Sequence, residues 1–127
     1  IPVISMMHEW EKGKRMHKQD LDNLGGSMRL GSYESILKKD TLVFKIYQKT
    51  KIYERHRHRY EVNYNYLKPI IKSGITLSAM SPNNKLVEII ERTNHPWFIG
   101  VQFHPELKSR PLAPHPLFSS FIKHCIK

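Results

Sequence analysis

Two side chains that could cooperate in proton transfer, His104 and Glu106, stand on either side of a proline. Histidine titrates near neutral pH and can take a proton from a nucleophile, while a neighbouring carboxylate fixes its tautomer and stabilises the imidazolium that forms. Pro105 fixes its own φ angle and favours an extended conformation at His104, so both side chains belong to a rigid turn. The pattern predicts a catalytic base with the carboxylate that orients it.

A structural interpretation of the same residues stays open. A histidine and a glutamate after a strand are also typical of an ordinary surface turn, and a base needs a nucleophile to act on. The only cysteine, Cys125, lies among apolar residues at helical spacing, which predicts an inert thiol in the core. The residues by themselves therefore supply a base and its orienter without a nucleophile.

Histidines and arginines alternate from Arg55 to Arg59. In an extended chain this alternation sends the histidines to one face and the arginines to the other. Three interpretations remain open: a solvated strand edge, a site in which arginine binds an anion or a carboxylate, and a metal site that uses His56 and His58. Arginine suits a carboxylate because its planar guanidinium can donate two parallel hydrogen bonds. Since no third ligand stands at a spacing typical of zinc sites, no metal is predicted.

The turn at 104–106 must be positioned by a sheet. Residues 97–103 are almost continuously apolar and rich in aromatic and β-branched types, which predicts a buried central strand covered on both faces. Catalytic groups in open α/β sheets gather beyond the carboxyl ends of strands, where this turn stands. The remaining pattern predicts strands over 1–7, 27–37, 75–81 and 86–91, helices over 41–47, 63–72 and 117–126, and an exposed charged loop over 8–23.

The composition limits the class of protein. The 127 residues include 21 Lys and Arg against 11 Asp and Glu, a net charge of +10 that would attract nucleic acid, nucleotide phosphates or an acidic partner. The basic residues are scattered along the chain, so a basic module that binds RNA or nucleotides is kept as an alternative function. A single cysteine excludes an internal disulfide, and the absence of an apolar run of about 20 residues argues against a membrane span. Together they predict a cytoplasmic protein.

Several segments, in order, resemble the CTP synthase family in its class I (triad) glutamine amidotransferase domain. Leu-Gly-Gly-Ser-Met-Arg-Leu-Gly at 24–31 is similar to the family's Leu-Gly-Gly-Thr-Met-Arg-Leu-Gly. The run Arg-His-Arg-His-Arg-Tyr-Glu-Val-Asn at 55–63 is similar to the family's signature. Val-Glu-Ile-Ile-Glu at 87–91, Asn-His-Pro-Trp-Phe at 94–98 and Gln-Phe-His-Pro-Glu at 102–106 follow in the family's order.

The resemblance implies an α/β, three-layer class I glutamine amidotransferase-like fold with a central, mostly parallel sheet. At matching positions it implies that His104 activates a cysteine thiolate and later assists hydrolysis of the γ-glutamyl thioester, with Glu106 orienting His104. It also implies that Arg59 and Tyr60 bind glutamine, through the guanidinium of Arg59 and the backbone beside it.

Partners outside this chain follow from the same resemblance. Ammonia released from glutamine would pass to an upstream synthase domain, where ATP with Mg phosphorylates UTP and ammonia converts it to CTP. Arg29 and Gly31 match the region in which family members sense GTP. The intact enzyme would be a homotetramer, and no cofactor would be bound within this chain.

The sequence also departs from the family. The family's nucleophilic cysteine sits on a Gly-x-Cys-x-Gly elbow upstream of the matching segment, and no such motif is present here. The domain that binds ATP and UTP is missing as well. We therefore expect residues 1–127 to be the C-terminal portion of the amidotransferase domain of a ligase of pyrimidine nucleotide biosynthesis, inactive by itself. An inactive truncated product stays as an alternative.

Overall fold

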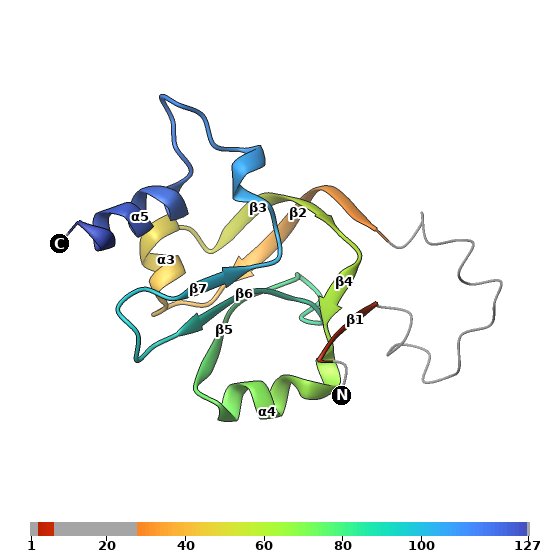
Figure 1. Cartoon of the computed structure of the whole chain (residues 1–127). Coiled ribbons are helices and arrows are strands. Elements are labelled where there is room, and N and C mark those ends of the chain that lie inside the picture. The colour runs from red at the N-terminus through yellow and green to blue at the C-terminus, as the bar shows by residue number, and fades with distance from the viewer. Residues whose placement is uncertain (1–2, 7–27, 127) are drawn as a thin grey trace.

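The computed structural model describes residues 3–6 and 28–126. Its elements in chain order are β1 (Ile4–Met6), β2 (Arg29–Leu37), α3 (Leu42–Tyr47), β3 (Lys51–His58), β4 (Tyr60–Val62), the 3-10 turn η2 (Tyr64–Tyr66), α4 (Leu67–Lys72), β5 (Ile75–Met80), β6 (Val87–Arg92), β7 (Ile99–Val101), the 3-10 turn η3 (Pro105–Leu107) and α5 (Pro116–Cys125). Helices α3 and α5 lie together on one side of the molecule, and α4 lies at the opposite end next to β5 (Figure 1). The loop predicted over 8–23 falls outside the described residues.

One sheet carries the fold. Its strand order is β3-β2-β5-β6-β7, and each pair of neighbours is antiparallel, as is the separate pair of β1 and β4. The α/β class is found as predicted, but the mostly parallel sheet is not found among the described strands. Parallel neighbours need a crossover of about a dozen or more residues. The turns at 81–86 and 93–98 are too short for that, so β5, β6 and β7 form successive hairpins.

The strand that precedes the turn at 104–106 differs from its prediction. Only Ile99–Val101 of the apolar run forms a strand, half-buried and at the edge of the described sheet beside β6. Phe98 is exposed before it, whereas Phe103 leaves the strand and enters the core. The prediction of a central strand covered on both faces is thus wrong for the described residues. A continuous apolar run predicts that some of its side chains are buried, but it does not predict how many strands pair with it.

Other predicted elements are confirmed near their predicted bounds. The strands predicted over 27–37, 75–81 and 86–91 are β2, β5 and β6. The helix predicted from Asn63 is η2 followed by α4, and the Asn63 side chain caps it by accepting a hydrogen bond from the Asn65 amide at 3.0 Å. Gly74, with φ of 90°, ends it in the left-handed conformation that glycine adopts readily.

Helix α3 begins under two caps. The Thr41 hydroxyl accepts a hydrogen bond from the Phe44 amide at 3.2 Å, which confirms the predicted start. The buried carboxylate of Glu91, on β6, accepts from the Leu42 and Val43 amides at 2.8 and 3.1 Å. A negative charge at this end also complements the helix dipole. Strand β6 therefore fixes the position of α3 against the sheet.

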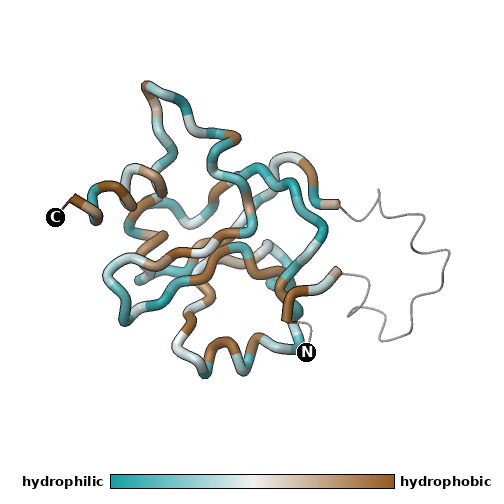
Figure 2. The backbone as a smooth tube through the Cα atoms, viewed as in Figure 1, coloured by the Kyte–Doolittle hydropathy of each residue, from teal (hydrophilic) through white to brown (hydrophobic). Residues whose placement is uncertain are grey.

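The core lies between the sheet and the pair α3 and α5, and apolar colour follows β6 and α5 in Figure 2. Its buried apolar residues are Leu37, Val43, Ile52, Ala79, Ile89, Phe103 and Leu117. None of the described helices is long and apolar enough to cross a membrane.

Helix α5 confirms the helix predicted over 117–126 but not its burial. Pro116 occupies the first turn, where its missing amide hydrogen costs nothing, and Leu117 is buried. Phe121 and Ile122 are exposed, and so is Cys125. The prediction of a core thiol is therefore wrong. Helical spacing identifies an apolar face, but it does not show that another element covers that face.

We predict that Glu91→Gln lowers the free energy of unfolding by about 1 to 3 kcal/mol, because an amide nitrogen would face one of the two helix amides that the carboxylate now accepts. Urea denaturation measures the change. Glu34→Gln, on the outer face of β2, is the matched control and should leave the stability nearly unchanged. An equal loss in both variants would show that the cap on α3 contributes nothing specific.

Candidate active site

Strand β3 organises the site. Its residues alternate between exposed and buried, with Glu54 and His56 each 1% exposed and Arg55 and Arg57 on the surface. The predicted alternation is confirmed, but the inner face is no solvated strand edge. His56 and His58 bind each other instead of converging with a third ligand in the described residues.

The turn with the predicted base lies against β3. His104 Nδ1 and Glu106 Oε1 are 2.7 Å apart, and the His104 amide donates to the Arg55 carbonyl at 2.9 Å. Both side chains reach solvent, with 38% and 58% of their surfaces exposed. The hydrogen bond from His104 holds the pKa of the Glu106 carboxyl below its ordinary value. The structure thus brings together the two residues that the sequence predicts as a pair.

A buried ion cluster lies behind this turn. Arg29 Nη1 is 3.3 Å from Glu61 Oε1, Arg29 Nη2 is 2.7 Å from Glu88 Oε1, and the guanidinium lies 4.6 Å from the centre of the Tyr33 ring. Burial raises the pKa of Glu61 to about 7, although Arg29 opposes the shift. The cluster joins β2, β4 and β6.

Of the two positions implied for GTP sensing, Arg29 belongs to this cluster and Gly31 lies two residues further along β2. The guanidinium of Arg29 is occupied by two carboxylates and a ring, and it is almost fully buried. Gly31 has a φ of 102° and pairs with His56 across the ladder of β2 and β3. The GTP role stays a prediction, because nothing in this geometry tests it.

The predicted glutamine-binding residues lie in the bend between β3 and β4. Arg59 is half-buried and makes no side-chain hydrogen bond or ion pair with the described residues. The Tyr60 side chain is exposed, while its carbonyl accepts a hydrogen bond from His58 Nδ1 at 2.9 Å. A guanidinium with no partner in the described part of the chain, beside a fixed backbone, suits a substrate carboxylate.

Sequence reasoning missed a second buried cluster. Glu54 Oε1 accepts hydrogen bonds from His115 Nε2 at 2.9 Å and the Tyr47 hydroxyl at 3.1 Å. Lys108, just after η3, donates to the Tyr53 carbonyl and lies 3.6 Å from the Glu54 carboxylate. The cluster therefore ties the segment after His104 and the start of α5 to β3. The only sequence signal for this cluster was an acidic residue, Glu54, at an inward-facing position of a predicted strand. Such a residue needs a hydrogen-bond partner, but the sequence does not show which residue provides it.

The described residues place no thiol beside the base. Cys125 lies near the end of α5, and no hydrogen bond or ion pair within the described part of the chain joins it to His104 or Glu106. The arrangement can accept a proton and stabilise the charge that results. It contains no nucleophile in contact with the base.

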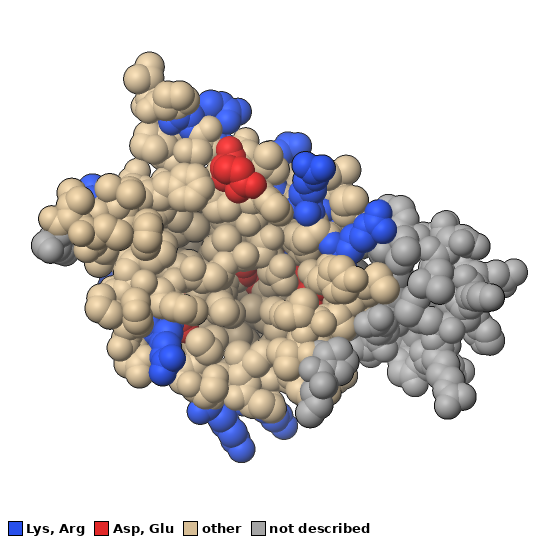
Figure 3. Space-filling view, in the orientation of Figure 1, with Lys and Arg blue, Asp and Glu red and all other residues tan. Residues whose placement is uncertain are grey.

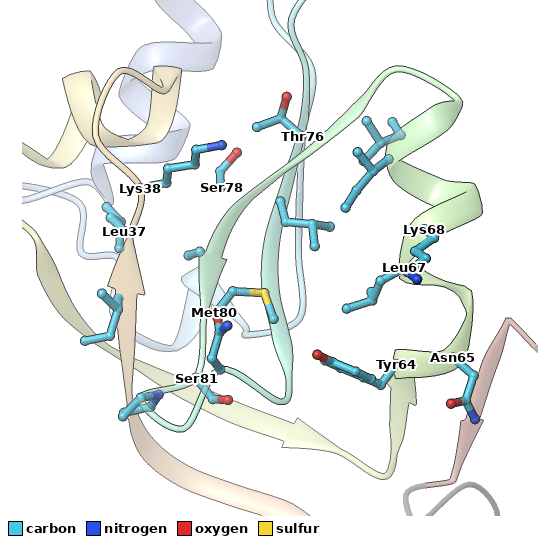
Figure 4. Close-up of a pocket in the computed structure, with 17 residues that line it drawn as sticks. Leu37, Lys38, Tyr64, Asn65, Leu67, Lys68, Thr76, Ser78, Met80 and Ser81 are labelled. Atoms are coloured by element: carbon cyan, nitrogen blue, oxygen red, sulfur yellow. The ribbon is translucent and has the colours of Figure 1, made fainter.

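A cavity lies elsewhere in the described part of the chain. A hollow of about 890 Å³ opens between α4, β5 and the end of β2, and Tyr64 and Leu67 point toward Met80 across it (Figure 4). None of the predicted site residues lines this cavity. Basic side chains are scattered over the face shown in Figure 3 and form no continuous patch there. Neither feature marks a second chemical centre.

Comparison with known proteins identifies the family. The family model described as "Glutamine amidotransferase class-I" matches residues 7–124. The chain belongs to this family. It is 60% identical to the CTP synthase of Pelagibacter ubique over 97% of this chain, and 54% identical to that of Zymomonas mobilis over 99%. It spans 23% of the length of each of these relatives.

A solved structure supports the amidotransferase fold. The glutaminase domain of Trypanosoma brucei CTPS, with bound acivicin, matches 96% of this chain with a TM-score of 0.80 and 34% identity. The match takes up 45% of that chain. The resemblance to the amidotransferase domain of CTP synthase and the α/β class I amidotransferase fold are therefore confirmed, although the described strands pair antiparallel.

We predict that His104→Ala raises the pKa of Glu106 toward its ordinary value, because the hydrogen bond that favours the carboxylate is lost. An NMR pH titration of the Glu106 side-chain carbon measures the shift. His95→Ala, an exposed histidine in the turn before β7, should leave the titration unchanged. A Glu106 pKa that is the same with and without His104 would contradict the pairing.

Proposed function

We propose that this chain is the C-terminal portion of the glutamine amidotransferase domain of a CTP synthase, in which His104 and Glu106 act in the release of ammonia from glutamine. The observation that carries the proposal is the 2.7 Å contact between His104 Nδ1 and Glu106 Oε1 in a solvent-accessible turn. The family membership and the CTP synthase relatives support it.

The contact sets the direction of proton transfer. A carboxylate only accepts, so His104 Nδ1 carries a hydrogen toward Glu106 and Nε2 is left to accept a proton. His104 Nε2 would take the proton of a cysteine thiol, and the thiolate would attack the amide carbon of glutamine. The imidazolium would return its proton to the leaving nitrogen, which releases ammonia. His104 would then activate the water that hydrolyses the thioester to glutamate.

The thiol would come from the preceding part of the domain. Cys125 has no contact with the base in the described residues, and the sequence holds no other cysteine. The chain by itself would therefore be inactive. Ammonia would serve a synthase domain that uses ATP, Mg and UTP, in a cytoplasmic homotetramer regulated by GTP. The basic module for RNA or nucleotides and the inactive truncated product remain the alternatives.

Arg59 would bind the carboxylate of glutamine. It directly follows β3, and the Arg55 carbonyl of that strand anchors the turn of His104. The bend that carries Arg59 and the turn that carries the base are thus fixed to one strand. A substrate held at Arg59 would extend its side-chain amide toward the catalytic pair.

The decisive experiment uses this chain within the complete enzyme that supplies the upstream thiol. His104→Ala should lower glutamine-dependent CTP formation by about a hundredfold or more, because general base catalysis is lost, and leave ammonia-dependent formation intact. Cys125→Ala is the matched control and should have full activity with glutamine. Loss of both activities in His104→Ala would indicate a structural role, and inactivity of Cys125→Ala would identify Cys125 as the nucleophile.

We also expect Arg59→Ala to raise the KM for glutamine about tenfold or more, because a charge-assisted hydrogen bond to the substrate is removed. The kcat with ammonia should not change. Arg57→Ala, on the exposed face of β3, controls for the loss of positive charge. If the two variants have the same KM for glutamine, Arg59 does not bind the substrate.

A further inference from the structure

Four groups form a continuous row from the centre of the sheet to the bend that carries Arg59. Glu88 Oε2 on β6 is 3.3 Å from His56 Nε2, and His56 Nδ1 is 2.7 Å from His58 Nε2 on β3. His58 Nδ1 in turn is 2.9 Å from the Tyr60 carbonyl. The side chains of Glu88 and His56 have no exposed surface. Neither Glu88 Oε2 nor His56 Nε2 forms a hydrogen bond in the described part of the chain, so these two buried atoms face each other unsatisfied.

The Tyr60 carbonyl gives the row a direction. A carbonyl only accepts, so His58 Nδ1 carries a hydrogen. If His58 is neutral, its Nε2 accepts and His56 Nδ1 must donate. The Nε2 atom of a neutral His56 then has a lone pair that faces Glu88 Oε2. Two acceptors at this distance repel each other unless Glu88 carries a proton, which it would donate to His56.

A second arrangement contains the same number of protons. In it Glu88 is ionised, His56 carries its hydrogen on Nε2, and His58 is an imidazolium that donates at both nitrogens. In a third arrangement with the same number of protons, Glu88 is ionised and His56 is the imidazolium, which donates to Glu88 from Nε2 and to a neutral His58 from Nδ1. The row thus holds one proton beyond an ionised Glu88 and two neutral imidazoles, at Glu88, at His56 or at His58. Each arrangement assigns one donor and one acceptor to every contact in the row.

The surroundings favour the arrangement with the proton on Glu88. Burial raises the pKa of Glu88, against the opposing effect of Arg29. Burial lowers the pKa of His56 to about 3, and Arg29 and His104 act in the same direction. Burial also lowers the pKa of His58, with Arg29 and His104 adding to the shift and the hydrogen bond to the Tyr60 carbonyl opposing it. Among the described residues, the charged or titratable groups that face the row are Arg29 from β2, Glu61 from β4 and His104 from the turn after β7.

Arg29 also determines which oxygen of Glu88 holds the proton. Its Nη2 donates to Glu88 Oε1 at 2.7 Å, so Oε1 must accept and Oε2 is left for the proton. An amide side chain has the same pattern, with an oxygen that accepts and a nitrogen that donates. Glutamine at this position would therefore reproduce a protonated Glu88.

We propose that Glu88, His56 and His58 form a directional relay that holds one buried proton at Glu88 and positions the Tyr60 carbonyl, and with it the bend that carries Arg59, for glutamine. The three are positioning residues and do not touch the substrate. The substrate rests on the function proposed above, whereas the relay itself does not. Its inner end at Glu88 is closed to solvent, so the proton remains in place during turnover.

The relay is tested first without any substrate. In the full chain with 15N-labelled histidine, NMR should show His56 and His58 both protonated at Nδ1 and unprotonated at Nε2 near neutral pH. A doubly protonated His58, with His56 protonated at Nε2, or a doubly protonated His56 would overturn the placement of the proton. Unprotonated Nδ1 on His58 would overturn the relay altogether.

Two substitutions at Glu88 test the positioning role in the glutamine-dependent enzyme that contains this chain. Glu88→Gln should keep the KM for glutamine within about twofold of the wild type and retain both histidine tautomers, because it mimics the protonated acid. Glu88→Leu removes the donor to His56 and should raise that KM about tenfold, with kcat for ammonia unchanged. An unchanged KM in Glu88→Leu, or a large increase in Glu88→Gln, would overturn the proposal.

The design separates the two claims. An enzyme that does not use glutamine at all would contradict the proposed function, while the histidine NMR would still decide whether the relay exists. If Glu88→Leu fails to fold, the wild-type tautomers and the KM of Glu88→Gln still decide the proposal. Loss of the tautomers with an unchanged KM would show that the relay does not position the substrate.

Discussion

The inner face of β3 buries ionisable side chains, and the rest of the site depends on that constraint. A buried charge or polar group is costly unless it is hydrogen-bonded, so Glu54 and His56 need partners from other elements. Their partners come from β6, α3 and the start of α5. The polar requirement of one strand thus fixes the relative positions of elements that are far apart in the sequence.

Both halves of the candidate active site attach to this strand. The amide of His104 binds the β3 backbone, and Arg59 follows the end of β3. A buried cluster of ion pairs contributes little net stability, because desolvation offsets the attraction between its charges. The cluster instead fixes the orientation of the elements that carry the site. The base and the proposed carboxylate site are held by one rigid strand rather than by two independent loops.

Local pattern was sufficient where partners are close in sequence. His104 and Glu106 are two residues apart, the Thr41 and Asn63 caps act on the next turn, and alternation along β3 was predicted from its residues alone. Predictions were wrong where they required knowledge of covering elements. The apolar run at 97–103 became a short edge strand, and Cys125 lies exposed although its helical spacing was identified correctly.

The sequence by itself determined the amidotransferase family, the pairing of His104 with Glu106 and most of the elements, because motifs, caps and periodicities are local properties of the chain. Tertiary structure alone decided that Glu88 meets His56 and that Glu54 meets His115, which are separated by 32 and 61 residues in the sequence. Each of these residues has several possible partners by chemistry. Only the positions of β6 and α5 relative to β3 decide which partner each residue meets. They thereby also decide where the proposed buried proton is held.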